Sequence, residues 1–193
     1  RKGFWILFLA ILAVGAFLRF HDLGRAILWI DEIGVASFGE VSKSVGRIVS
    51  EIYGAKFKAF TGQHVPFQYV LMNSFYHLYS LFGLKVDPSW DSYSFYVRLP
   101  FALLGLLTLP VICGVASRVF NRKVGLWTMG VMAVSCFHVW QSRDSTSYSP
   151  LVFFLSLNLL GLTGMIQRQA VFPRWKYSSE VIFVLGTAGA LFT

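Results

Sequence analysis

Charged residues are scarce in this 193-residue chain: they make up only 13% of it, with 9 Asp and Glu against 17 Lys and Arg. Soluble globular domains carry about 25% charged residues. The chain is also 55% hydrophobic, contains 19 Phe, and has a mean hydropathy of +0.61. This composition excludes an ordinary soluble domain and predicts an all-α protein, a polytopic bundle of membrane helices.

Two further scarcities narrow the function. The chain has two cysteines, Cys113 and Cys136, both in apolar stretches and without the paired spacing of a zinc or disulfide site, so we expect small core residues. The formal charge of +8 comes from Lys and Arg scattered between apolar runs. Because these residues form no basic stripe with interleaved aromatics, we expect no nucleic-acid partner.

The apolar runs predict one membrane domain over residues 1–193, since a crossing needs about 20 apolar residues. Residues 1–20 form a first span, and no small-x-small cleavage site follows it, so we expect an uncleaved signal anchor. Residues 21–98 form a long loop, and residues 99–166 hold three spans, at 99–117, 124–140 and 151–166. Residues 179–193 begin a further span, which predicts an incomplete bundle, the N-terminal part of a longer protein.

Three short basic segments predict the orientation: Arg1-Lys2, residues 118–123 and residues 168–176, which together hold eight of the basic residues. Such loops stay on the cytoplasmic side. The first helix then runs outward, and residues 21–98 and 141–150 lie outside. In this arrangement the apolar segment 66–84 has no room to cross, so we expect it to dip into the interface. The alternative is a true span with Asn73 and His77 facing the protein interior.

The predicted outer loop also contains an amphipathic pattern. Apolar residues recur at helical spacing from Ile33 to Tyr53, with charged residues such as Arg47 and Glu51 between them. This spacing predicts an amphipathic helix lying on the membrane surface.

Two polar clusters fall on the predicted outer side. Asp31 and Glu32 follow the first span; they fit a capping pair at a helix N-terminus, or a general base whose pKa is raised near lipid. The second cluster is the loop 141–148 with Arg143 and Asp144, which fits either a solvated loop or a site where Arg143 contacts a lipid phosphate.

Two more outer-side residues lie between these clusters in sequence. His64 precedes the 66–84 segment, and Arg98 lies at the outer end of a predicted span. Taken alone, His64 is typical of an interfacial histidine, and Arg98 is typical of a side chain that snorkels to the headgroups.

The order of these motifs resembles that of the membrane-embedded GT-C glycosyltransferases that use polyprenyl-phosphate sugars, such as protein O-mannosyltransferases and aminoarabinose transferases of lipid A. Asp31-Glu32 match the family's acidic pair, and Arg98-Leu99-Pro100, followed by Gly105, match its Arg-Leu-Pro motif. Residues 142–148 match its second outer loop except that Thr146 replaces an arginine, and residues 64–67 retain only one of two prolines. The resemblance covers about residues 4–165.

The resemblance implies an inverting sugar transfer from an undecaprenyl- or dolichyl-phosphate carrier to an acceptor hydroxyl. Asp31 would be the base, oriented by Glu32. The donor phosphate or substrate would be bound by further residues of these motifs: His64, Arg98, Arg143, Asp144 and Tyr148. No cofactor is expected; a divalent cation held by Asp31, Glu32 and Asp144 is conceivable but not favoured.

The expected partners are the lipid-linked sugar donor, membrane lipids and further membrane subunits. We favour the bacterial inner membrane over the endoplasmic reticulum. The competing interpretation is a non-catalytic GT-C-like subunit or scaffold of a larger complex, which the short length and the two motif departures favour. A transporter would need more charged or helix-breaking residues within the spans.

Overall fold

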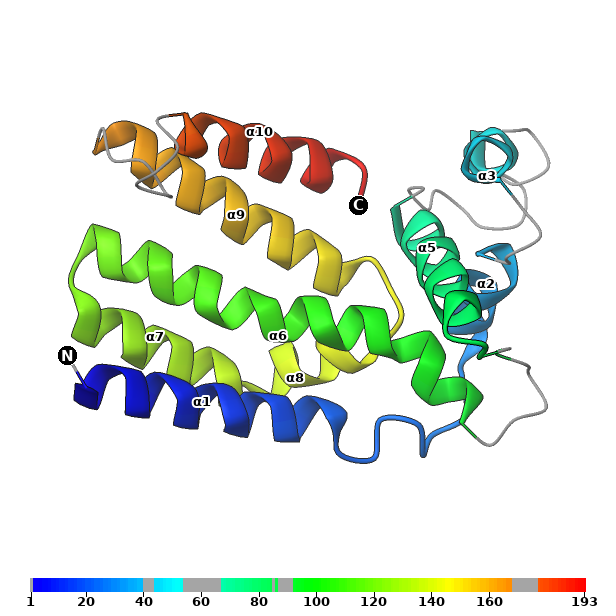
Figure 1. Ribbon diagram of the computed structural model, residues 1–193, viewed down its shortest axis with the longest axis horizontal. Helices are drawn as coiled ribbons and strands as arrows, with labels where there is room; N and C mark the ends of the chain where they lie inside the picture. The colour runs from blue at the N-terminus through cyan, green and yellow to red at the C-terminus, as the bar shows by residue number, and fades with distance from the viewer. Residues whose placement is uncertain (1, 40–43, 54–66, 85, 87–91, 168–176) are drawn as a thin grey trace.

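A computed structural model describes residues 2–39, 44–53, 67–84, 86, 92–167 and 177–193, and every regular element in these ranges is a helix (Figure 1). The helices are α1 Lys2–Phe20, α2 Ile30–Phe38, α3 Val45–Tyr53, α5 Phe67–Leu81, α6 Tyr93–Val119, α7 Arg122–Val134, α8 Cys136–Arg143, α9 Tyr148–Ile166 and α10 Ser178–Leu191. The predicted all-α helical bundle is confirmed.

Three of these helices, α1, α6 and α9, are long and apolar enough to cross a membrane, and α10 is a shorter apolar helix. The central helix α6 packs against α1, α7, α8 and α9, and α10 packs on α9. Large apolar side chains such as Trp5, Phe17, Trp127 and Phe137 are exposed on the outside of the bundle. This surface is compatible with a membrane protein.

The bundle has two distinct ends (Figure 1). Helices α1, α7, α8 and α10 run one way, and α6 and α9 run the other. One end of the bundle therefore contains the start of α1, the α6–α7 turn, the C-terminus of α9 and the N-terminus of α10. We call it the basic end after Lys2, Arg118, Arg122 and Lys123. The opposite end, which we call the site end, consists of residues 20–32, 93–98 and 143–148. Helices α2, α3 and α5 lie there.

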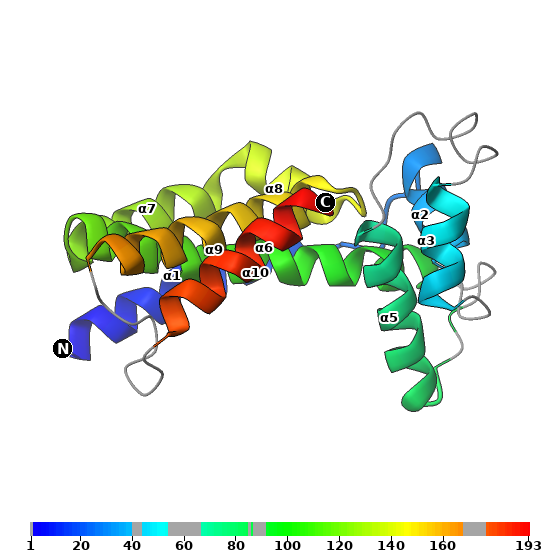
Figure 2. The same cartoon turned by 90° about the horizontal axis from the view of Figure 1, so that it is seen from above.

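The segment expected to dip into the interface forms α5, which has 15 residues and runs steeply across the bundle direction in Figure 2. Asn73 is buried and donates to the carbonyl oxygen of Gly39, whereas His77 is exposed. Helix α5 contacts α2, α3 and the start of α6 around buried residues such as Val35, Ile48 and Met72. It is thus part of a second apolar core at the site end.

The prediction of one continuous amphipathic helix from Ile33 to Tyr53 is wrong. Its first part belongs to α2, which ends at Phe38 with Gly39 as C-cap, and a separate helix, α3, begins at Val45. A Cβ at Gly39 would lie 2.8 Å from the Met72 Cβ, so this turn passes close to α5. Tertiary packing therefore divides a pattern that periodicity alone reads as one helix.

Helix α6 begins at Tyr93, before the predicted span, and continues through Pro100. Proline has no N–H for the carbonyl four residues earlier, which here is that of Tyr96. The Tyr79 hydroxyl of α5 donates to the Tyr96 oxygen at 3.0 Å and replaces that bond. Contact with α5 thus satisfies the carbonyl that the proline leaves free, and the helix carries Arg98 into the site end.

The span predicted at 124–140 is two helices, α7 and α8, separated at Ser135. Ser135 has φ −60° and ψ 115°, and its hydroxyl accepts from the backbone N–H of His138 as the N-cap of α8. The prediction that both cysteines are small core residues is confirmed for Cys113, which is buried. It is wrong for Cys136, which is exposed in the first turn of α8. Whether α7 and α8 together cross a membrane stays a prediction.

Candidate functional site

The centre of the site end is a buried ion pair between Glu32 of α2 and Arg98 of α6. Arg98 Nε donates to Glu32 Oε1 at 2.8 Å, and Nη2 donates to Oε2 at 2.6 Å. Glu32 is 0% exposed and Arg98 is 6% exposed. This two-point geometry is the strong form of a charge-assisted hydrogen bond, and burial protects it from water.

The remaining N–H groups of Arg98 hold the segment between α1 and α2. Nη1 donates to the carbonyl oxygens of Leu23 at 3.1 Å and Ala26 at 2.8 Å, and Nη2 also donates to that of Ile27 at 3.2 Å. All five N–H groups of the guanidinium are therefore used within the protein. Arg98 organises the loop 21–29 and, in this conformation, has no donor left for the phosphate it was expected to bind.

Glu32 also connects α2 to the loop that follows α8. Its Oε1 accepts from the backbone N–H of Ser145 at 3.1 Å and from the Ser145 hydroxyl at 3.3 Å. Its Oε2 accepts from the backbone N–H of Trp29 at 3.2 Å, which caps α2. The capping interpretation of the acidic pair therefore holds for Glu32, but the same carboxylate joins three segments that are distant in sequence.

Asp31, the other member of the pair, is exposed. Its charge lies near the buried Tyr69 of α5 and contributes to raising the pKa of that phenol, although burial is the larger cause and a hydrogen bond with Gln68 opposes both. The start of α5 therefore lies beside the Asp31 carboxylate. His64 lies outside the described residues.

Asp144 and Arg143 lie close to the ion pair. Burial, and then the charge of Glu32, raise the pKa of Asp144, while Arg98 and Arg143 lower it by less. Arg143 donates to the carbonyl oxygens of Leu18 at 3.2 Å and of residue 22 at 3.1 Å. In the described part of the chain it uses only two of its five N–H groups, so it is the cation of this cluster with free donors.

A close helix contact positions the loop that carries Asp144. A Cβ on Gly105 of α6 would overlap the side chain of Ser142 in α8, so the glycine allows α8 to approach α6. The Ser149 hydroxyl at the start of α9 donates to the Phe101 carbonyl oxygen at 2.7 Å. These contacts fix both ends of the loop 143–148 on α6, three or more residues beyond Arg98.

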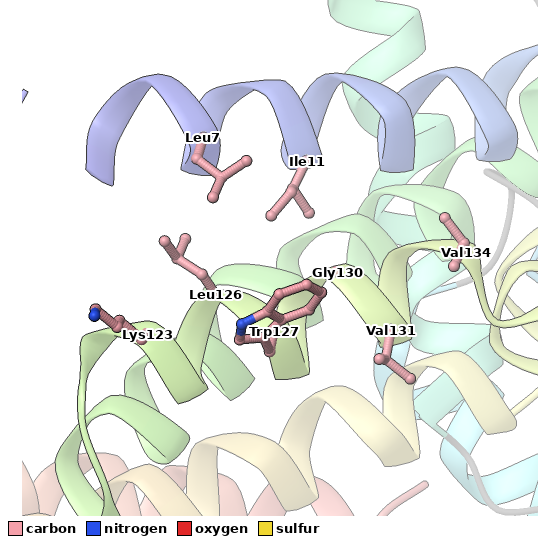
Figure 3. A pocket seen from close by; sticks show the side chains of 8 residues that line it. All are labelled: Leu7, Ile11, Lys123, Leu126, Trp127, Gly130, Val131 and Val134. Atoms are coloured by element: carbon pink, nitrogen blue, oxygen red, sulfur yellow. The ribbon is translucent and has the colours of Figure 1, made fainter. Parts of the chain in front are cut away.

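Two apolar grooves reach the bundle surface. One, about 500 Å³, lies between α1 and α7, where Leu7 and Ile11 face Leu126 and Trp127 (Figure 3); Lys123 at the basic end is its charged lining residue. The second, about 670 Å³, is lined by residues of α7, α8 and α9. It combines apolar side chains with polar ones at the site end, including Tyr148, which the resemblance places in substrate binding.

Three residues at or near the site end, Ser145, Arg19 and His138, are not marked by any motif or spacing in the sequence. Ser145 belongs to the predicted outer loop, but nothing in its spacing indicates a bond to Glu32. Arg19 is fully buried and its Nη2 lies 2.7 Å from His138 Nδ1. A charged residue within an apolar run was a signal that could have identified Arg19, since such residues are costly in a membrane span.

Apart from His64, which lies outside the described residues, the residues predicted for the site fall into three groups. Glu32, Arg98, Arg143 and Asp144 are brought together, Asp31 lies beside them on α2, and Tyr148 lines the second groove. Within the described ranges, no three His, Cys, Asp or Glu side chains form a cluster that could hold a metal ion. Comparison of the chain with protein-family models, curated proteins and solved structures found no match.

Proposed function

We propose that this chain is the N-terminal part of a membrane glycosyltransferase that moves a sugar from a polyprenyl-phosphate carrier to an acceptor hydroxyl at the outer membrane face. The observation that carries the proposal is the meeting of three separate motifs at the site end. Glu32, Arg98 and the loop 143–145 come from α2, α6 and the α8–α9 link, and hydrogen bonds or charge interactions connect them.

Asp31 suits the role of base because it is exposed at the N-terminus of α2, next to the rigid Glu32–Arg98 pair. In the proposed reaction, the acceptor hydroxyl oxygen attacks the anomeric carbon, and the bond from that carbon to the phosphate oxygen breaks. The hydroxyl proton passes to Asp31, and the phosphate leaves on its lipid carrier. Glu32 positions the helix that holds Asp31 instead of contacting substrate.

The leaving phosphate gains negative charge and needs a cation. Arg143 is suited to this task, since the two carbonyl contacts fix its guanidinium while other N–H groups stay free among the described residues. Asp144 lies next to it and would orient sugar or acceptor hydroxyls. The groove that contains Tyr148 offers an apolar path for the lipid tail.

The proposal includes an orientation in which the basic end is cytoplasmic and the site end is outside. Single cysteines at positions 31 and 144, in a chain whose exposed Cys136 is replaced by serine, should react with an impermeant reagent added outside intact cells. A cysteine at position 180, at the start of α10, should react only after the membrane is opened. Labelling of 31 and 180 from the same side would refute the orientation.

The activity is tested by transfer of radiolabelled sugar from polyprenyl-phosphate donors in membranes carrying the protein. Asp31→Asn should abolish transfer. Glu180→Gln is the matched control, because Glu180 is also an exposed acid in the first turn of a helix, and its loss should leave transfer unchanged. Equal transfer by the Asp31→Asn and unaltered chains would remove Asp31 from the role of base.

A second candidate function is a non-catalytic membrane subunit. This function is favoured by the hydrogen bonds of Glu32 and Arg98. All N–H groups of the Arg98 guanidinium bind Glu32 or backbone carbonyl oxygens, so they stabilise the fold and are not available to a substrate. A subunit of this kind would need the ion pair but not Asp31. Loss of complex assembly on breaking the pair, together with no Asp31-dependent transfer, would support it over the enzyme.

A further inference from the structure

Arg19 in the last turn of α1 is a buried cation. Its Nη1 donates to the carbonyl oxygens of Gly15 at 2.8 Å and Ala133 at 3.2 Å, and Nη2 donates to that of Met132 at 3.4 Å. The last two carbonyls belong to the final turn of α7, which the break at Ser135 leaves without helical partners. Arg19 thus caps α7 from a neighbouring helix.

The positive charge of Arg19 has no counter-ion in the described part of the chain: the ion pairs there involve Asp22 and Glu32, not a carboxylate beside Arg19. Its Nε is also buried, and no described residue provides it with a hydrogen-bond acceptor. A buried cation without a counter-ion is costly even when it is hydrogen-bonded, so this position favours an anion nearby.

Arg19 fixes the chemical state of His138 in α8. Arginine can only donate, so the 2.7 Å contact from Nη2 requires His138 Nδ1 to accept. Nδ1 is then unprotonated, and the neutral imidazole carries its proton on Nε2. The Ser142 hydroxyl, 3.2 Å from the same Nδ1, donates to the His138 carbonyl oxygen and so does not compete for this role.

His138 lines the groove between α7, α8 and α9 with Ser135, Gln141 and Tyr148, beside apolar residues such as Trp127 and Phe137. Because Nδ1 faces Arg19, the nitrogen left for the groove is Nε2–H. We propose that this N–H, polarised by Arg19, donates to the phosphate of the lipid-linked sugar donor while the tail lies in the groove. The identity of this ligand rests on the proposed function.

Three observations select a phosphate-bearing lipid as the occupant. The groove's volume of about 670 Å³ is that of a ligand site, and its walls are mainly apolar, as a lipid tail requires. The uncompensated charge of Arg19 complements an anionic head group. Arg143 contacts the same turn of α1, at Leu18, so a second cation with free N–H groups lies close to the pair.

The test is equilibrium binding of radiolabelled undecaprenyl phosphate to the purified full chain in neutral detergent. Undecaprenol, which has the same tail without the phosphate, should compete at least about tenfold more weakly, since it lacks the charged group that accepts the hydrogen bond. Equal competition by undecaprenol would overturn the inference.

Two variants of nearly equal shape isolate His138. His138→Gln retains an oxygen to accept from Arg19 and an N–H for the groove, so it should keep most of the preference for phosphate. His138→Glu pairs with Arg19 and should fold, but it presents a negative charge to the groove and should lose the preference. Thr163→Val is the control, because it removes a hydroxyl that donates to the Leu160 carbonyl oxygen in α9 and does not line the groove, so this variant should bind normally.

Retained phosphate preference in His138→Glu would overturn the inference. Asp31→Asn separates it from the proposed reaction, because this variant should bind undecaprenyl phosphate normally while losing transfer. Normal phosphate selectivity without any sugar transfer would refute the proposed function alone. Asp31-dependent transfer with unchanged binding in His138→Glu would refute the role of His138 alone.

Discussion

Replacing Glu32 with glutamine tests whether the Glu32–Arg98 pair holds the site end together. The variant keeps the shape of the side chain but leaves the Arg98 guanidinium, 6% exposed, without its counter-ion. Removing one partner of a buried ion pair costs about 3–5 kcal/mol. For a chain of this size, 1 kcal/mol corresponds to about 2–4 °C, so the unfolding midpoint should fall by about 6–20 °C.

The assay is thermal unfolding in detergent at a fixed scan rate, followed by tryptophan fluorescence. Glu180→Gln removes an exposed carboxylate by the same chemical change and should leave the midpoint within about 2 °C of the unaltered chain. Arg98→Met should be destabilising too, because it strands the Glu32 carboxylate and three carbonyl oxygens. The double variant contains neither stranded charge, so it should be more stable than the sum of the two losses predicts.

Two results would refute this reasoning. A midpoint for Glu32→Gln within about 2 °C of the unaltered chain would show that the carboxylate charge is not needed for folding. Additivity of the two single losses within about 0.5 kcal/mol would show that Glu32 and Arg98 act independently, contrary to their two-point contact.

Three further variants test individual contacts. Gly105→Ala should lower the unfolding midpoint because its methyl group meets α8, typically at a cost of about 1–3 kcal/mol, whereas Gly34→Ala projects into open space and should not. Tyr79→Phe should lower the free energy of unfolding by about 1 kcal/mol and speed the exchange of backbone amides in the first turns of α6. Asp144→Asn should be stabilising at pH 7, because burial raises the pKa of Asp144 in the folded protein and so disfavours its charged form. Acidification toward the ordinary pKa of 3.8 protonates Asp144 and removes this cost from the unaltered chain, so the difference between the unfolding midpoints of the variant and the unaltered chain should close. A gap that widens on acidification would contradict that assignment.

The convergence at the site end was predictable because the basic loops order the helices. Once residues 118–123 and 168–176 are placed on one side, residues 31, 98 and 144 must share the other side, and the helix directions in Figure 1 agree with this arrangement. Hydropathy and loop charge predict the direction of each helix and the end of the bundle at which each loop lies, and the helix directions in the structure agree with that prediction.

Pair contacts were not predictable from the same signals. Glu32 and Arg98 are 66 residues apart, and a spacing pattern contains no information on which carboxylate an arginine meets. The break at Ser135 was missed because a single serine does not interrupt an apolar run. Arg19 was not singled out, because the carbonyls at the end of α7 that give it buried acceptors are more than 100 residues away in sequence.

The adjacent acids Asp31 and Glu32 lie in different surroundings. Consecutive residues of an α-helix are rotated by about 100° around its axis, so Asp31 and Glu32 cannot face the same surroundings. Glu32 turns inward to Arg98 and Ser145, while Asp31 remains exposed beside the start of α5. Because the hydrogen bonds of Glu32 fix α2, Asp31 is held in place while its own carboxylate oxygens take no part in the bonds to Arg98 and Ser145. In the proposed reaction, a single carboxylate would have to anchor α2 and also accept the proton, whereas the pair divides these two roles between Glu32 and Asp31.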